Sequence, residues 1–166
     1  MKFKAKELAY GAVIAGLYAA CSLIPPISAI SYGPIQFRIS EALMLLCLIS
    51  PSAVVGVTIG CFIANVFTPF GANFFDLVFG TLATLLAAVT TYLLRKPLTK
   101  HILLAPLPTV IFNALIVGSY LPIFMTDSSV AVHYYIFTVG AGEVAVCYIL
   151  GIALAKFCMK KGFFDR

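Results

Sequence analysis

Most charged residues of this chain occur in three clusters, and long, mainly apolar stretches separate the clusters. The clusters are Lys2, Lys4, Lys6 and Glu7 at the start, Arg95, Lys96 and Lys100 in the middle, and Lys156, Lys160, Lys161, Asp165 and Arg166 at the end. An uncharged apolar stretch of about 20 residues is the length that crosses a bilayer as a helix. The chain is also 62% hydrophobic and 10% charged, whereas soluble domains are nearer half apolar and one quarter charged. We therefore predict an all-α integral membrane protein.

Helix-breaking residues divide the apolar sequence into six short transmembrane helices within a single membrane domain over residues 1–166. The predicted spans are 7–24, 39–50, 52–67, 74–94, 103–124 and 133–157, with Pro25, Pro26, Gly33, Pro34, Pro51, Pro69, Gly71, Pro97 and Pro122 at or near their ends. The second span is short for a crossing, which is tolerated where neighbouring helices bury its ends. We interpret the first apolar run as a span and not as a cleaved signal peptide, because hydrophobicity resumes directly after it.

The basic residues predict the orientation of these spans. Six spans place both termini on one side, and ten of the eleven Lys and Arg residues then fall on that side, with Arg38 alone opposite. Cytoplasmic loops carry such an excess of basic residues, so we expect both termini to be cytoplasmic and the protein to be multi-pass in a bacterial cell membrane. The net charge of +5 is explained by this topology and does not require a nucleic-acid partner.

Few residues in the sequence have the arrangement that catalysis or metal binding requires. The five cysteines form no C-x-x-C pair and read as small packing residues, and the two histidines fall at opposite membrane faces. No G-x-x-x-x-G-K-[ST] stretch occurs, so no P-loop for ATP is present in the sequence. We predict no enzyme activity, no metal and no cofactor.

The first span has small residues along one broad helix face. Two series with a spacing of four, Gly11, Ala15, Ala19 and Ala12, Gly16, Ala20, lie side by side on that face. Small residues let helix backbones approach closely in lipid. The face therefore serves either to pack inside the protein's own bundle or to dock another membrane subunit.

Polar residues gather near the predicted outer surface. They are Tyr32, Gln36, Arg38, Glu41, Asn65, Asn73, Asp76, Asn113 and Glu143. An ionisable residue inside a membrane is costly and by default marks a functional site. The simpler alternatives are that Arg38 pairs with Glu41 across one turn and that the asparagines join helices by hydrogen bonds.

The same residues favour one kind of ligand. The predicted outer site has more carboxylates than its one arginine, so it should prefer a neutral or cationic molecule that is rich in hydrogen-bond donors. Aromatic rings lie at the same level, namely Tyr32, Phe37, Phe70, Phe74, Phe75, Tyr120, Tyr134 and Tyr135. A planar heterocycle with an amidine-like N–H edge would stack on such rings and bond to a carboxylate.

Several segments resemble the QueT family along nearly the whole chain. They are residues 30–43 (ISYGPIQFRISEAL), 60–65 (GCFIAN), 69–71 (PFG), 76–84 (DLVFGTLAT), 112–118 (FNALIVG) and the pair Gly142-Glu143. The resemblance implies an S component, the substrate-binding subunit of an energy-coupling factor (ECF) transporter, with the six-helix S-component bundle and a site near the outer face. The implied partners are a transmembrane coupling protein and two ATPase subunits that alone bind ATP. Ala15 and Ala19 match an Ala-x-x-x-Ala motif that contacts the coupling protein in this family.

The ligand implied by the resemblance is a 7-deazaguanine that serves as a queuosine precursor: the nitrile form, the aminomethyl form or queuine. We then expect Glu143 or Asp76 to accept from its guanine-like edge, with the other acid, or Glu41, near the amine. Asn113, Asn65 and Gln36 would bind the carbonyl and ring nitrogens. Transport would proceed by toppling of the loaded subunit in the membrane.

Other functions stay open at this stage. An S component for another vitamin or purine-like heterocycle fits the same residues. A stand-alone facilitator should have polar residues through the whole membrane depth, whereas the inner halves of the predicted spans are nearly featureless.

Overall fold

The structure, a computed structural model, describes residues 5–25, 27–32, 36–68, 71–123 and 131–162. All regular elements in these ranges are helical. Several residues used above lie outside the described ranges: Lys2, Lys4, Pro26, Gly33, Pro34, Pro69, Phe70, Asp165 and Arg166.

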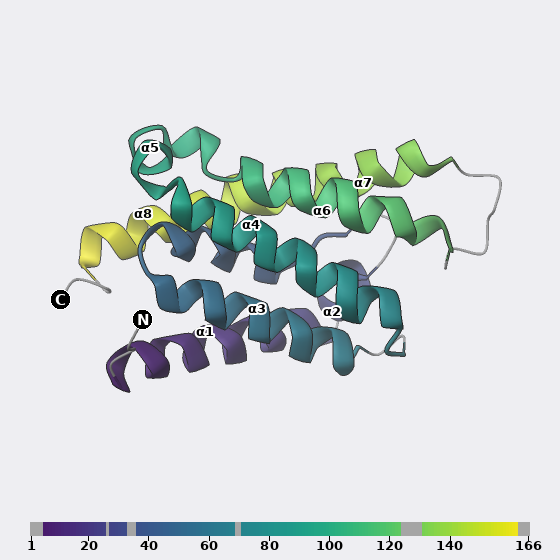
Figure 1. The fold of residues 1–166 in the computed structure, drawn as a ribbon, viewed down its shortest axis with the longest axis horizontal. Coiled ribbons are helices and arrows are strands. Elements are labelled where there is room, and N and C mark those ends of the chain that lie inside the picture. Colours follow the sequence, from purple (N-terminus) through teal and green to yellow (C-terminus); the bar gives the residue numbers. More distant parts are fainter. Residues whose placement is uncertain (1–4, 26, 33–35, 69–70, 124–130, 163–166) are drawn as a thin grey trace.

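Helical elements follow one another with few intervening residues. In chain order they are α1 (Ala5–Leu23), α2 (Ile27–Ser31), η1 (Ile39–Leu48), α3 (Pro51–Val66), η2 (Asp76–Gly80), α4 (Thr81–Leu93), α5 (Arg95–Lys100), η3 (Ile102–Leu104), α6 (Leu107–Tyr120), η4 (Leu121–Ile123), α7 (Val132–Val146), η5 (Cys147–Gly151) and α8 (Ile152–Lys161). Elements η1, η3 and η4 are 3₁₀ helices, and η2 and η5 are π-helical segments. Figure 1 shows the longer helices running roughly side by side along the molecule.

Three helical stretches in the described residues are long and apolar enough to cross a membrane, namely Asp76–Leu93, Ile102–Ile123 and Val132–Lys161. They coincide with predicted spans 74–94, 103–124 and 133–157, the last of which extends four residues further than predicted. Helices η1 and α3 are apolar but shorter. Helix α1 is long enough, but Lys6 and Glu7 near its start lower its hydropathy. The helical fold is thus confirmed, while the count of six spans stays a prediction.

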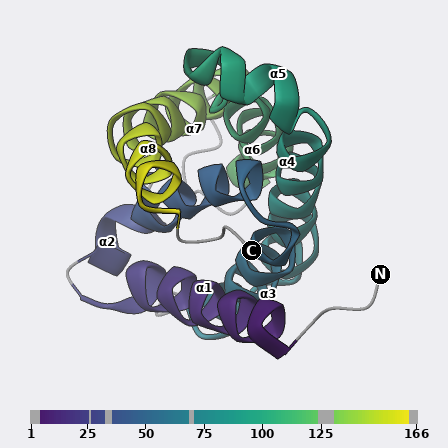
Figure 2. The same cartoon turned by 90° about the vertical axis from the view of Figure 1, so that its left-hand side faces the viewer.

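Element η1 is the centre of the bundle. It contacts α1, α3, α4, α5, α7, η5 and α8, and Figure 2 shows this segment, in blue, enclosed by the other helices. Every residue from Ser40 to Leu48 is buried. A 3₁₀ helix rises about 2.0 Å per residue, so ten residues extend about 20 Å instead of the about 15 Å of an α-helix. The predicted short span is therefore a stretched helix surrounded by protein.

Large apolar side chains cover the outside of the bundle. Phe67, Leu93, Phe137 and Ile149 are each about two thirds exposed or more. Such a surface is unfavourable in water and is what hydrocarbon tails of a bilayer accommodate. The exposed surface therefore agrees with a location in the membrane.

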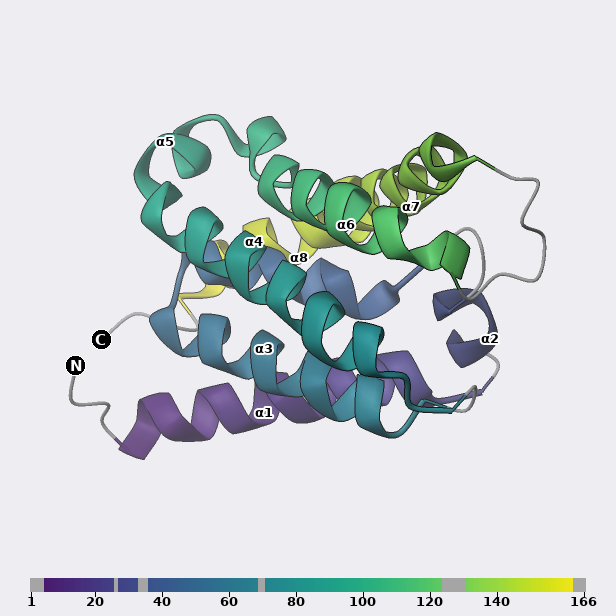
Figure 3. The same ribbon diagram turned by 45° about the vertical axis from the view of Figure 1, so that its right-hand side comes forward.

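Basic residues of the described helices gather at one end of the bundle. The start of α1, helix α5 and the end of α8 lie together at this end (Figure 1), and they carry Lys6, Arg95, Lys96, Lys100, Lys160 and Lys161. Helix α2, the end of α3 and the start of α7 lie at the opposite end (Figure 3). The asymmetry of charge predicted from the sequence is thus reproduced in space.

Helices α1 and α3 pack closely because glycines line their contact. A Cβ atom added at Gly56 would lie 2.7 Å from the carbonyl oxygen of Gly11, and one added at Gly60 would lie 2.8 Å from that of Ala15. Gly56 and Gly60 form a small-xxx-small pair of the kind that joins membrane helices. This pair complements Gly11, Ala15 and Ala19, which are buried on α1.

Candidate functional site

Two groups of polar side chains lie among the helices, one completely buried and the other half-buried at its carboxylate. The Glu41 cluster comprises Tyr18, Arg38, Glu41, Asn113, Glu143 and Cys147. The Asp76 cluster comprises Asn65, Asn73, Asp76 and Tyr120. Together with Tyr32 and Gln36, these clusters contain all nine substrate-binding residues that the sequence predicts.

Glu41 lies at the start of η1 and is completely buried. The hydroxyl of Tyr18, from α1, donates a hydrogen bond to its Oε1 atom. A second polar contact joins the same two helices, since Ser22 Oγ donates to Ser40 Oγ at 2.8 Å. Helix α1 is therefore tied to η1 by polar bonds as well as by packing.

Glu143 is 1% exposed and comes from α7. Asn113 Nδ2, from α6, donates to its Oε1 atom at 3.1 Å, and the Cys147 thiol donates weakly to Oε2 at 3.8 Å. The same thiol lies 3.6 Å from the carbonyl oxygen of Glu41. The Cys147 thiol is thus a neighbour of both glutamates.

Arg38 supplies a buried positive charge in these two clusters. It is 3% exposed, its Nε atom donates to the carbonyl of Ser31 at 3.3 Å, and its guanidinium lies 4.9 Å from the centre of the Tyr32 ring. No ion pair joins Arg38 to Glu41 within the described residues, so the simple pairing that their spacing allows is not what the structure contains.

Gln36 is held against α7 by a close backbone contact. It is 2% exposed, and a Cβ atom added at Gly142 would collide with its carbonyl oxygen. Only glycine permits this approach. Gly142 therefore positions the segment that carries Gln36 and Arg38 beside Glu143.

The Asp76 cluster is organised around one carboxylate at the start of η2. Tyr120 donates to Asp76 Oδ1 at 2.6 Å and Asn73 Nδ2 donates to Oδ2 at 2.5 Å. Asn73 Oδ1 accepts from the Asp76 amide at 2.7 Å, and Asn65 Nδ2 donates to the Asp76 carbonyl at 2.8 Å. Both carboxylate oxygens of Asp76 are thus engaged, and together with its backbone carbonyl they join η2 to α3 and α6.

Both clusters adjoin π-helical segments. Asp76 opens η2, and Cys147 opens η5 one turn after Glu143. A π-helical turn inserts an extra residue into a helix and is found preferentially at functional sites. The sequence contains no local signal that announces either segment.

The sequence does not single out four residues that lie in or beside the Glu41 cluster. Tyr18 and Ser22 fall within the first predicted span, Cys147 is predicted to be a packing residue, and Gly142 enters only through the family resemblance. Tyr18 could have been noticed, because a tyrosine that breaks a row of small residues on a buried helix needs a partner for its hydroxyl.

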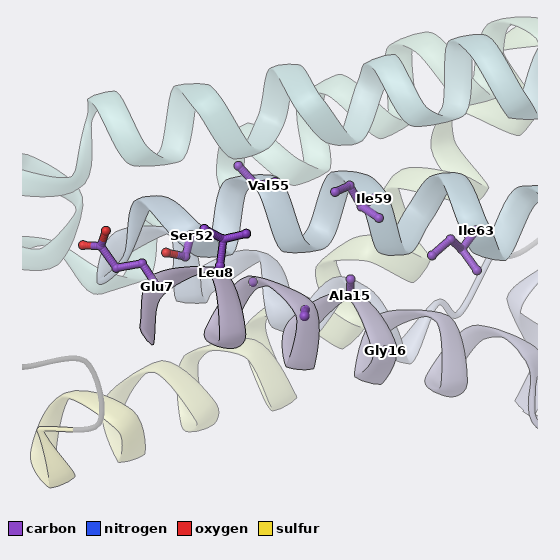
Figure 4. Close-up of a pocket in the computed structure, with 10 residues that line it drawn as sticks. Glu7, Leu8, Ala15, Gly16, Ser52, Val55, Ile59 and Ile63 are labelled. Carbon is purple, nitrogen blue, oxygen red and sulfur yellow. The ribbon is translucent and has the colours of Figure 1, made fainter. Parts of the chain in front are cut away.

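An apolar groove of about 520 Å³ lies on the exterior of the helix bundle, between α1 and α3. Gly11, Ala12, Ala15 and Gly16 line it from α1, and Val55, Ile59 and Ile63 line it from α3, with Glu7, Leu8 and Ser52 toward one end (Figure 4). Ala12 and Gly16 are exposed, Ala15 and Ala19 are 7% and 8% exposed, and Ala20 is half-buried. The predicted small face is therefore divided: one series packs on α3 and the other opens to the outside.

Together, these features define the class of protein. Apolar helices with an apolar exterior enclose several ionisable side chains, and charges in such surroundings mark substrate or ion sites. The chain is a multi-pass membrane protein with a buried polar site, as membrane transport proteins have.

Comparison with known proteins gives the family. The profile of the QueT transporter family matches residues 8–160, so the chain belongs to this family. Over 84 residues it is 42% identical to the queuosine precursor transporter QueT of Lactococcus lactis subsp. cremoris (strain MG1363), an alignment that covers 51% of this chain and 48% of that protein. The chain thus matches about half the length of this relative. No solved structure matches the chain.

Proposed function

We propose that the chain is the substrate-binding S component of an ECF-type transporter that imports a queuosine precursor of the 7-deazaguanine class. Membership of the QueT transporter family supports the transport role, and the name of the Lactococcus relative supports the substrate. The ECF arrangement is our extension of the family resemblance that the sequence motifs carry.

The Glu41 cluster is the observation that carries the substrate assignment. Glu41 and Glu143 are buried beside a single arginine, with the amide of Asn113 bonded to one of them. Burying charged groups is unfavourable unless they are paired. A flat base that donates several hydrogen bonds satisfies such a set of acceptors, and the aminomethyl form and queuine would add a compensating positive charge.

Energy for import would come from two ATPase subunits joined to a transmembrane coupling protein, and ATP would bind to the ATPase subunits alone. We assign the coupling protein to the groove between α1 and α3, where Ala12 and Gly16 are open to another helix. The complete topology in this proposal has six spans and both termini in the cytoplasm. The loaded subunit would topple to present its site inward.

Binding of ligands to the purified chain tests the substrate assignment. The chain is titrated calorimetrically with the nitrile precursor, the aminomethyl precursor, queuine and guanine. We expect tight binding of at least one deazaguanine, at least about tenfold stronger than guanine, a difference of about 1.4 kcal/mol. Absence of heat with every deazaguanine would rule the substrate out.

Reconstitution tests the ECF arrangement separately. Proteoliposomes that contain this chain with the coupling protein and both ATPases should accumulate the bound deazaguanine when ATP is inside, and the chain alone should not. Equal uptake by the chain alone would show a stand-alone facilitator instead.

A further inference from the structure

Two buried charged side chains in the Glu41 cluster each keep an atom without a hydrogen-bond partner among the described residues. The atoms are Nη2 of Arg38 and Oε2 of Glu41. The two residues are 3% and 0% exposed, so water at the protein surface does not reach them. A buried polar atom without a partner costs about 1 to 3 kcal/mol, and more when it carries charge.

The rest of each side chain is fixed by other groups. Arg38 is held through its Nε bond to Ser31 and by the Tyr32 ring, whereas Glu41 is held through its Oε1 bond to Tyr18. One tight turn joins the two residues, because the Glu41 amide donates to the Arg38 carbonyl at 2.9 Å. The result is one free donor and one free acceptor, close in sequence and oriented by separate anchors.

The other two acids of the site differ in this respect. Each oxygen of Glu143 already accepts a hydrogen bond, from Asn113 and from Cys147. Each oxygen of Asp76 likewise accepts one, from Tyr120 and from Asn73. Glu41 is therefore the acid whose carboxylate has an uncommitted oxygen.

A ligand that reaches both free atoms would offer an acceptor to Arg38 and a donor to Glu41. A lactam edge, in which a ring C=O adjoins a ring N–H, has this pattern, and a guanidinium with a carboxylate complements it. Building on the proposed function, we infer that Arg38 and Glu41 together recognise the lactam edge of the 7-deazaguanine ring. Arg38 Nη2 donates to the ring carbonyl, and Glu41 Oε2 accepts from the adjacent ring N–H. Glu143 is then a positioning residue that holds Asn113 and borders the site.

A ligand pair tests this assignment on the unaltered protein. 7-Deazaguanine has the lactam edge, whereas 7-deaza-2,6-diaminopurine has nearly the same shape but an amino group in place of the carbonyl and no hydrogen on the adjacent nitrogen. We expect the diamino compound to bind at least about 100-fold more weakly, because it leaves both buried groups unpaired. Equal affinity for the two would overturn the assignment.

Two matched variants distinguish the two glutamates. Glu41→Gln should weaken 7-deazaguanine binding by about 10- to 100-fold, and Glu143→Gln should weaken it less than Glu41→Gln does, because a glutamine oxygen can still accept from Asn113. Both variants are first checked for a single symmetrical elution peak. A greater loss in Glu143→Gln than in Glu41→Gln would overturn the assignment.

The outcomes separate the two levels of the proposal. Failure of the unaltered protein to bind any 7-deazaguanine would overturn the proposed function. Binding of 7-deazaguanine without discrimination against the diamino compound would overturn the lactam assignment alone. The ligand-pair experiment uses the unaltered protein, so its result does not depend on the folding of any variant.

Discussion

The Glu41 cluster and the groove between α1 and α3 are built from the same helix in opposite ways. Tyr18 faces inward from α1 and donates to Glu41, whereas Ala12 and Gly16 face outward and line an apolar surface. The cluster is held by a few hydrogen bonds that are shielded from lipid. The groove exists because the α1 residues that line it are mostly glycine and alanine, whose side chains are too small to fill it. One helix can thus serve a ligand on one face and a protein partner on the other, and variants should separate the two roles.

The largest effect is expected at Gly142, on the cluster side. In Gly142→Ala the new methyl group meets the Gln36 backbone, which should lower the free energy of unfolding by about 3 kcal/mol and abolish measurable deazaguanine binding. Gly140→Ala is the matched control, because its added Cβ would meet only Ala114 Cβ at 3.4 Å. Thermal unfolding and calorimetry check both, and equal behaviour of the two alanines would contradict the contact with Gln36.

A substitution in the groove should slow transport without changing ligand affinity. Ala12→Leu places a large side chain in the groove while leaving the Glu41 cluster untouched, so we expect unchanged deazaguanine affinity and about tenfold slower ATP-driven uptake, a loss of about 1.4 kcal/mol of association. Val13→Leu is the control, because Val13 is exposed and is not among the residues that line the groove. Normal uptake by Ala12→Leu in proteoliposomes would remove the groove as the docking surface.

The contact between the two regions can be tested at the glycines. Gly60→Ala would bring a Cβ atom within 2.6 Å of Tyr18 Cβ, so it should lower the free energy of unfolding by about 2 kcal/mol. Gly16→Ala meets nothing within 4 Å and should be neutral or stabilising by up to about 1 kcal/mol, since alanine favours the helix. If Gly16→Ala proved the more harmful of the two, the packing of α1 on α3 would need revision.

The smallest effect is expected from Tyr18→Phe, which removes the polar bond between α1 and Glu41. A buried polar atom that loses its partner costs about 1 to 3 kcal/mol, and polar contacts between membrane helices lie at the low end of such values, so the free energy of unfolding should fall by about 1 kcal/mol. Tyr148→Phe is a suitable control, because Tyr148 is half-buried against the core and its hydroxyl makes no hydrogen bond within the described residues. A loss greater than that in Gly60→Ala would mean that polar bonds and not packing hold α1.

Much of the fold could be predicted from the apolar runs and from the helix-breaking residues between them. The apolar runs that begin near Asp76, Ile102 and Val132 are helices of nearly the predicted lengths, because a long stretch without charge has few alternatives to a helix. The 3₁₀ form of the central helix η1 could not be predicted from the sequence. The sequence of η1 is ordinary for an apolar helix, and its stretched form depends on the elements that surround it.

The candidate site was predictable as a list but not as an arrangement. Arg38, Glu41, Asn113 and Glu143 stand out because polar residues are rare in this sequence. The hydrogen bonds of these residues join distant parts of the chain; Asn113 and Glu143, for example, are 30 positions apart. No local spacing in the sequence encodes such contacts. The partner of Glu41 was Tyr18 from the first helix, although the nearby Arg38 was the obvious choice by spacing.

The sequence by itself determined that this chain is helical, where it is apolar, and which residues are too polar to be buried without a role, since these depend on composition and local pattern. Only the tertiary structure decided which of those residues have uncommitted atoms and which half of the small face remains open. The reason is physical: hydrogen-bond partners and steric contacts are set by distances between helices, and those distances arise when the whole bundle packs.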